Sequence, residues 1–241
     1  MWFYENFCIF VGDKAMNIFK RTYIWCKRFR YRKGYGVHSP FAFSLMQDVI
    51  HERRTYYAYR DLRWVRKEAP AQLPRYPQRI DKLLFRLVNY LSPAYVLEVG
   101  TGSGISLHYL AAGRRGAQVV SLCGPEADER VSELTASCPN AELLAGNELE
   151  LLAEELRLHE VVDFLHVAHT EHCREVVARC LDRVDGRSLF VIEGIHRTSD
   201  KLAWWKELQE DVRTGITFDL YELGLIFFDK TKYKQHYVVN F

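Results

Sequence analysis

The sequence predicts an α/β fold with a doubly wound, mostly parallel sheet, antiparallel C-terminal strands and a helical N-terminal extension. Three observations predict it. From Tyr95 onward, short β-branched or apolar segments alternate with helical patterns, which is typical of parallel strands joined by crossover helices. A glycine-rich turn, VGTGSG, follows the first of these segments. The last apolar segments have no helices between them, which requires hairpins and therefore antiparallel pairing at one edge.

The first part of the chain is basic and aromatic. Residues 1–90 contain 18 Lys and Arg against 7 Asp and Glu, whereas the remainder contains 15 against 24. Residues 1–33, which include FKRTYIWCKRFRYRK, predict an amphipathic basic helix that lies on a surface, on a partner or on the main domain. We favour packing against the acidic C-terminal part, while contact with a membrane surface stays an alternative.

The segment that follows contains two boundary signals. The stretch 34–40, GYGVHSP, predicts an ordered turn with Ser39 as the N-cap of a helix and Pro40 in its first position. Residues 67–78 contain three prolines, which exclude a regular helix. We therefore predict an extension or lid over 1–78 and a main domain over 79–241, which begins with a helix at about 80–90.

Five βα units follow in the main domain. Because crossover connections are right-handed, such units form a doubly wound, Rossmann-like sheet. The predicted strands are 95–100, 118–123, 141–145, 161–168 and 188–193, each followed by a helix, at 104–113, 126–137, 147–158, 171–182 and 199–213. Further strands are predicted in ITFDLYEL, GLIFFD and QHYVVNF, at 216–223, 224–229 and 235–241.

The strand-to-helix turn is the strongest functional signal. Gly100, Gly102 and Gly104 permit a tight turn and the close approach of a ligand to the backbone, and the amides of the following helix can hold a carboxylate or phosphate. A dinucleotide-binding turn has the spacing G-x-G-x-x-G, with its third glycine where this chain has Ile105. The spacing therefore disfavours NAD or FAD.

The segment VLEVGTGSGIS, residues 96–106, resembles the first motif of class I S-adenosylmethionine-dependent methyltransferases, particularly the small-molecule O-methyltransferase-like branch. A bacterial group of methyltransferase-like proteins is further resembled by four segments, GYGVHSPF, LLFRLVNYL, IHRTSDKLAWW and LGLIFF. The resemblance implies S-adenosylmethionine as the cofactor. It implies cofactor contacts at Glu98, Gly100, Thr101, Gly102, Ser103, Gly104 and Ser106, and at Cys123 at the end of the second strand.

The chain departs from the family pattern at three strand ends. Cys123 stands where an acid usually accepts hydrogen bonds from the ribose hydroxyls, and a thiol replaces it poorly. Glu126 is an alternative acceptor, although we favour interaction with a helix dipole for it. Ala168 and Gly194 stand where metal-dependent relatives have acids, which leaves Glu193 alone. One carboxylate is too few ligands for magnesium, and we predict no metal.

Three histidines, His166, His169 and His172, raise a zinc hypothesis. A strand end followed by a turn does not place residues three apart on one face, and no partner Cys or carboxylate has the required spacing. We therefore favour capping or solvated histidines.

For catalysis, Glu193 and His196 are the candidates for a base or an acceptor ligand, because they follow the fifth strand at the carboxyl edge of the sheet. A capped loop with a surface histidine is the alternative. Tyr35 and His38 are candidates for a lid, although the neighbouring glycines equally suit a structural turn.

The leading hypothesis is a metal-independent methyltransferase that acts on an oxygen or nitrogen of a small molecule, with a homodimer left open. A catalytically silent protein that serves as a binding module is the alternative, because acids are missing at Cys123, Ala168 and Gly194. A nucleic-acid methyltransferase ranks third, since no Asn-Pro-Pro-aromatic motif is present. Six scattered cysteines and the absence of a signal or membrane-spanning segment predict a cytoplasmic protein.

Overall fold

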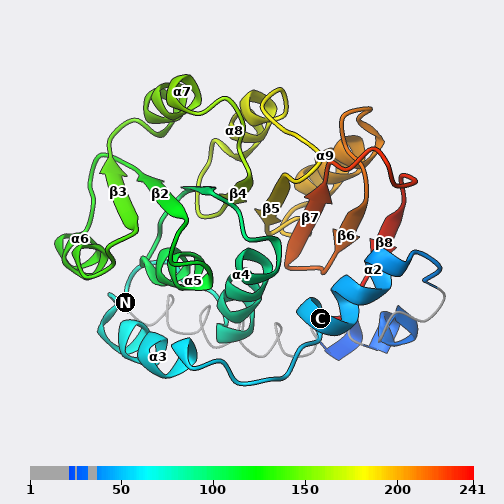
Figure 1. Cartoon of the computed structure of the whole chain (residues 1–241), viewed down its shortest axis with the longest axis horizontal. Coiled ribbons are helices and arrows are strands. Elements are labelled where there is room, and N and C mark those ends of the chain that lie inside the picture. Colours follow the sequence, from blue (N-terminus) through cyan, green and yellow to red (C-terminus); the bar gives the residue numbers. More distant parts are fainter. Residues whose placement is uncertain (1–21, 25, 32–36) are drawn as a thin grey trace, which may run out of the picture.

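The computed structural model describes residues 22–24, 26–31 and 37–241. In these residues an eight-stranded sheet forms the middle of the molecule, with helices on both faces (Figure 1). The strand order is β3-β2-β1-β4-β5-β7-β6-β8. The strands are β1 (Tyr95–Val99), β2 (Gln118–Cys123), β3 (Ala141–Ala145), β4 (Phe164–Val167), β5 (Leu189–Glu193), β6 (Thr217–Asp219), β7 (Leu223–Phe227) and β8 (His236–Val238).

The predicted doubly wound sheet is confirmed. Strands β1 to β5 pair in parallel, and β7 lies antiparallel between β5 and β6. The last strand, β8, pairs in parallel with β6 at the outer edge of the sheet, because the chain passes β6 on its way from the antiparallel β7 to β8. The carboxyl ends of all the strands except β7 therefore face the same edge of the sheet.

The helices divide between the two faces. Figure 1 shows α7 (Glu148–Leu158), α8 (Cys173–Cys180) and α9 (Ser199–Glu210) on one side of the sheet, where their apolar residues share one buried cluster. On the other side lie α4 (Gln78–Leu91) and α5 (Ile105–Gly113), with α3 (Ala58–Glu68) and α6 (Glu129–Ala136) packed against α5. This side also carries the short elements η1 (Phe29–Tyr31), α2 (Pro40–Leu45) and the π-helical turn η2 (Met46–Ile50).

The residues before α4 contribute to the same core as the sheet. Ser39 accepts a hydrogen bond from the N–H of Ala42, and Pro40 begins α2, so the predicted helix start is confirmed. Leu45 and Ile50 are buried with strand residues such as Val96. The boundary at residue 78 stays a prediction. So do the predicted N-terminal helix, the lid residue Tyr35 and contact with a membrane, which lie wholly or mostly outside the described residues.

In the part of the chain described above, no helix is both long enough and apolar enough to cross a membrane.

Candidate functional site

The glycine turn joins β1 to α5 and has the conformation that the sequence predicts. The φ angles of Gly100 and Gly102 are 91° and 55°, which side chains rarely adopt. A Cβ atom on Gly100 would lie 2.1 Å from the carbonyl oxygen of Ala168, so the turn packs directly on the backbone that follows β4. Gly104 caps α5, and the buried Ser106 lies in the first turn of this helix.

A buried chain of hydrogen bonds begins beneath this turn. The Thr101 and Ser121 hydroxyl oxygens lie 2.7 Å apart, and the Ser121 hydroxyl donates to Oε2 of Glu98 over 2.6 Å. Glu98 and Ser121 are register partners on β1 and β2, which places their side chains on one face. Because Glu98 has no exposed surface, it supports the turn through these hydroxyls, and direct contact of Glu98 with a cofactor stays a prediction.

The series of buried hydrogen bonds continues through His166 to Glu193. His166 is the register partner of Glu98 on β4, and its Nδ1 atom lies 2.9 Å from Oε1 of Glu98. Its Nε2 atom lies 2.7 Å from Oε1 of Glu193 on β5. A neutral imidazole has only one N–H, so both contacts are hydrogen bonds only if His166 is an imidazolium or one carboxyl is protonated. Either arrangement places two protons on these three groups.

Glu193 is the last residue in this series of hydrogen bonds. Burial raises the pKa of its carboxyl well above the usual range, although the charge of Lys201 acts in the opposite direction. Its Oε2 atom is buried and has no hydrogen-bond partner among the described residues. The predicted candidate Glu193 is therefore a buried group directed toward His166.

A cavity of about 190 Å³ lies beside the glycine turn at the carboxyl ends of β1 and β2. Carboxylates dominate its polar lining, since Glu126, Asp128 and Glu148 all contribute. Asp128 is the N-cap of α6, so Glu126 lies in the preceding loop and not in the first helical turn that we expected. Glu148 was not among the predicted site residues, although an acid in the first helical turn after the third strand could have indicated it.

Cys123 lines the same cavity. Burial raises the pKa of its thiol, and the thiol donates to the carbonyl oxygen of Leu144 over 3.5 Å. Cys123 is therefore a protonated thiol near neutral pH, and the carboxyl groups of Glu126 and Glu148 line the same cavity.

An aromatic pair covers the outer side of the turn. The rings of Tyr76 and His169 stack with centroids 4.5 Å apart, and a Cβ atom on Gly102 would lie 2.6 Å from Cδ2 of His169. The carbonyl oxygen of Pro74 accepts the N–H of Ser103 over 3.0 Å. Burial lowers the pKa of His169 to about 4, so its ring is neutral at pH 7. No sequence pattern predicted that this loop lies over the turn.

The three histidines of the zinc hypothesis lie in different environments. His166 is buried between two carboxylates, His169 stacks on Tyr76, and His172 is exposed before α8. No group of three His, Cys, Asp or Glu side chains within the described ranges has a geometry that could hold a metal ion.

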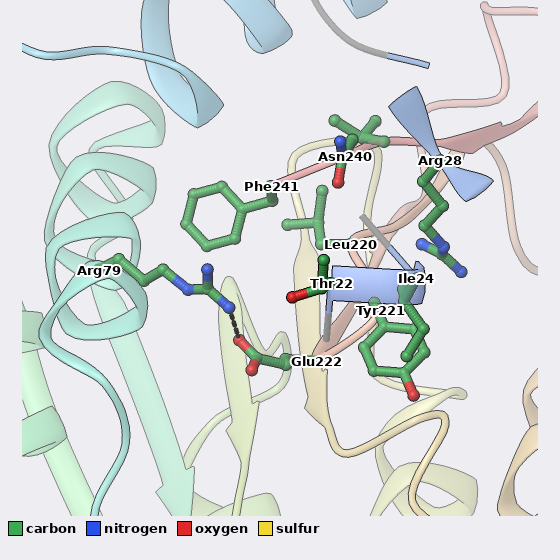
Figure 2. A pocket seen from close by; sticks show the side chains of 10 residues that line it. Thr22, Ile24, Arg28, Arg79, Leu220, Tyr221, Glu222, Asn240 and Phe241 are labelled. Carbon is green, nitrogen blue, oxygen red and sulfur yellow. Dashed lines mark hydrogen bonds and ion pairs between the residues drawn. The ribbon is translucent and has the colours of Figure 1, made fainter. Parts of the chain in front are cut away.

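A second cavity, of about 340 Å³, lies near the carboxyl ends of β6 and β8. Figure 2 shows Arg79 directed toward Glu222 on one side of it, with Arg28 and Tyr221 on the other. Leu220, Val239 and Phe241 supply apolar surface. The cavity therefore combines paired charges with aromatic and aliphatic walls, which is the usual composition of a small-molecule site.

Next to this cavity, His196 belongs to a cluster centred on Asp219. His196 Nε2 lies 2.7 Å from Oδ2 of Asp219, and Arg28 donates to both Asp219 oxygens, over 2.9 and 3.1 Å. The His196 ring stacks on Tyr221 with centroids 4.7 Å apart. Burial raises the pKa of Asp219, but the hydrogen bonds from His196 and Arg28 outweigh burial and hold it below its usual value.

The two predicted catalytic residues thus lie in separate clusters, with Glu193 against His166 and His196 against Asp219. Their catalytic roles stay predictions. Asp219 was not predicted as a site residue, although an acid at the carboxyl end of a predicted strand could have indicated one. The lid candidate His38 is exposed just before α2.

No protein-family model matches the chain, and no curated protein matches it in sequence. Solved structures do match in fold. A putative O-methyltransferase from Klebsiella pneumoniae has a TM-score of 0.55 at 16% identity, over 74% of this chain and 92% of that one. An O-methyltransferase from Bacillus cereus, in complex with S-adenosylhomocysteine, has a TM-score of 0.53 at 19% identity, over 77% and 94%.

The O-methyltransferase TomG from Streptomyces achromogenes, in complex with S-adenosylmethionine, has a TM-score of 0.53 at 17% identity, over 83% of this chain and 98% of that one. Each of these structures is matched over more than nine tenths of its own length. The chain therefore has the Rossmann-like fold of class I S-adenosylmethionine-dependent methyltransferases.

Proposed function

We propose that this protein is an S-adenosylmethionine-dependent methyltransferase that acts on an oxygen or nitrogen of a small molecule without a metal. The observation that carries the proposal is the glycine turn beside a carboxylate-lined cavity, at the edge of the sheet where doubly wound folds bind ligands. A second cavity at the carboxyl ends of β6 and β8 supplies a place for the acceptor.

The residues of the first cavity fit the cofactor chemically. S-adenosylmethionine carries a sulfonium, an ammonium and one carboxylate, so its net charge is positive and suits a lining of three acids. The N-terminus of α5 suits the cofactor carboxylate. Glu126 and Glu148 replace the missing acid at Cys123 as acceptors for ribose hydroxyls. Because 190 Å³ is small for a ligand of this size, the loop with Pro74 and Tyr76 must move outward when the cofactor binds.

When bound, the cofactor supplies an electrophilic methyl group, and the chain must align the acceptor with it. An acceptor hydroxyl or ammonium also loses a proton. We propose His196 as the group that takes this proton, because Asp219 orients its ring beside the second cavity. Glu193 then acts through His166 to fix the end of β5 and the loop that carries His196.

Metal independence rests on the strand ends. Ala168 has no ligating side chain, Gly194 has none either, and Oε1 of Glu193 already lies 2.7 Å from Nε2 of His166. We further propose a cytoplasmic location, since Cys26, Cys123, Cys138, Cys173 and Cys180 are all free thiols.

One observation favours the second candidate, a silent protein that keeps the fold as a binding module. The Tyr76–His169 stack covers the glycine turn on the side from which a ligand would approach. If this cover is permanent, the turn has only a structural role.

Methyl transfer from S-adenosylmethionine with an isotopically labelled methyl group tests the proposal. The purified protein is incubated with sets of phenols, carboxylic acids and amines. Label in a small-molecule product, lost in His196→Gln and retained in His172→Gln, supports methyl transfer. Binding of neither S-adenosylmethionine nor S-adenosylhomocysteine contradicts it and favours the binding module.

A further inference from the structure

A stripe of basic side chains on α4 faces a third cavity. Arg79, Lys82 and Arg86 are spaced three and four residues apart, so they share one face of the helix. The loop 50–55, which includes Arg53 and Arg54, closes the other side of the cavity. Its volume is about 310 Å³, within the range of small-molecule sites.

This cavity has an excess of positive charge. Among the described residues, five cationic side chains line it, against one side-chain carboxylate, that of Glu52. Glu52 pairs with Arg54, and Arg79 pairs with Glu222 from the neighbouring cavity. In the part of the chain that the structure describes, no carboxylate forms an ion pair with Arg53, Lys82 or Arg86.

Part of the lining is rigid. Arg86 is buried, and its guanidinium donates to the carbonyl oxygens of Val49 and Ile50, over 2.6 and 3.2 Å. The Lys82 ammonium lies 5.0 Å from the centre of the Tyr59 ring. These contacts hold two charges at the cavity wall without neutralising them.

Cations three and four residues apart on a helix repel one another, and an anion in the cavity would remove this cost. A phosphate group has several charged oxygens and accepts hydrogen bonds from Arg and Lys together, whereas a lone carboxylate has two oxygens. We propose that this cavity binds the phosphate group of a small molecule.

The basic cavity adjoins the candidate acceptor cavity, because Arg79 and Phe241 line both. If the protein is a methyltransferase, as proposed above, the acceptor is then a phosphorylated small molecule whose phosphate lies against α4. This extension rests on the proposed function, whereas phosphate binding itself does not.

Isothermal titration with pyrophosphate at low ionic strength tests the proposal. We expect wild-type binding at about millimolar Kd or tighter, and at least about tenfold weaker binding in the double variant Arg53→Gln, Lys82→Gln. The control Arg60→Gln, Arg115→Gln removes two exposed cations outside the cavity and should change Kd less than about twofold.

No binding to the wild type, or equal weakening in both double variants, would overturn the proposal. Titration of the same variants with S-adenosylhomocysteine separates the two claims. Pyrophosphate binding without S-adenosylhomocysteine binding supports the phosphate cavity and contradicts the proposed methyltransferase.

Discussion

The imidazole Nδ1 of His166 lies 2.9 Å from Oε1 of Glu98, and both side chains are fully buried. Through its other nitrogen, His166 also reaches Glu193. One histidine thus connects the strand that carries the glycine turn to the strand that precedes His196. The arrangement ties the candidate cofactor side of the sheet to the candidate acceptor side.

His166→Phe removes both hydrogen bonds and leaves two buried carboxylates without a partner on this side. We expect the free energy of unfolding to fall by about 3–5 kcal/mol, measured by urea denaturation at pH 7. His172→Phe, at an exposed position before α8, should change it by no more than about 0.5 kcal/mol. Equal effects of the two substitutions would show that the bridge does not stabilise the fold.

Asp81 should make stability depend on pH. Burial raises the pKa of its carboxyl from 3.8 to about 7, and the ion pair with Arg66 limits the rise. At pH values between 3.8 and about 7, the folded chain binds more protons than the unfolded chain. The protonated carboxyl of Asp81 therefore stabilises the fold at low pH, and this stabilisation is lost as the pH rises toward 7. In the wild type, the free energy of unfolding should therefore fall by up to about 1.4 kcal/mol per pH unit over this range, and Asp81→Asn should abolish this fall.

The measurement is urea denaturation of the wild type and Asp81→Asn at several pH values between about 4 and 7.5. His169 acts in the opposite sense, because its pKa of about 4 lies below its usual value. The difference between the two proteins therefore isolates Asp81. The control Asp61→Asn changes an exposed carboxylate and should keep the wild-type slope. If the free energy of unfolding of Asp81→Asn depends on pH as steeply as that of the wild type, Asp81 does not have the raised pKa.

Asp219→Asn should destabilise the protein by about 2–3 kcal/mol, because Arg28 and His196 lose a charged acceptor in a largely buried cluster. The difference from wild type should shrink as pH falls through the pKa of Asp219, since the wild-type carboxylate is then protonated too. Thermal and urea denaturation measure the free energy of unfolding of both proteins. Asp182→Asn breaks an exposed pair with Arg213 and should cost at most about 1 kcal/mol; a similar cost at both sites would contradict the role of the cluster.

Magnesium should not affect cofactor binding. The strand ends that would ligate it carry Ala168 and Gly194. We expect the same Kd for S-adenosylhomocysteine in the presence of magnesium and in the presence of a chelator. A Kd that weakens at least about tenfold on chelation would point to a metal site that Glu193 helps to form.

Sequence patterns predicted the type and order of the elements, although β6 (Thr217–Asp219) and β8 (His236–Val238) are shorter than the strands predicted at 216–223 and 235–241. The apolar runs gave the strands, and Ser39 and Pro40 gave a helix start, because capping and strand signals are local. The strand predicted at 161–168 is shorter, at Phe164–Val167, and just before it the Asp163 carboxylate accepts the N–H groups of Ala94 and Tyr95.

The site was predicted only in part, for a physical reason. The glycine turn is a local feature, whereas the His166 bridge depends on strand register and the Tyr76–His169 stack joins residues 93 positions apart. Asp219 acquires its role only when β6 takes its place beside β7. Such contacts depend on tertiary packing, and no spacing within one segment reveals them.

The most direct test of the central claim is isothermal titration with S-adenosylhomocysteine of the wild type, Gly102→Asp and Gly116→Asp. Gly102 has a φ of 55° and no room for a Cβ atom beside His169, whereas Gly116 has nothing within 4 Å of the corresponding position. We predict about micromolar binding by the wild type and Gly116→Asp, and none by Gly102→Asp. Absence of binding to the wild type at millimolar ligand, or equal binding by all three proteins, would contradict a cofactor site at the glycine turn.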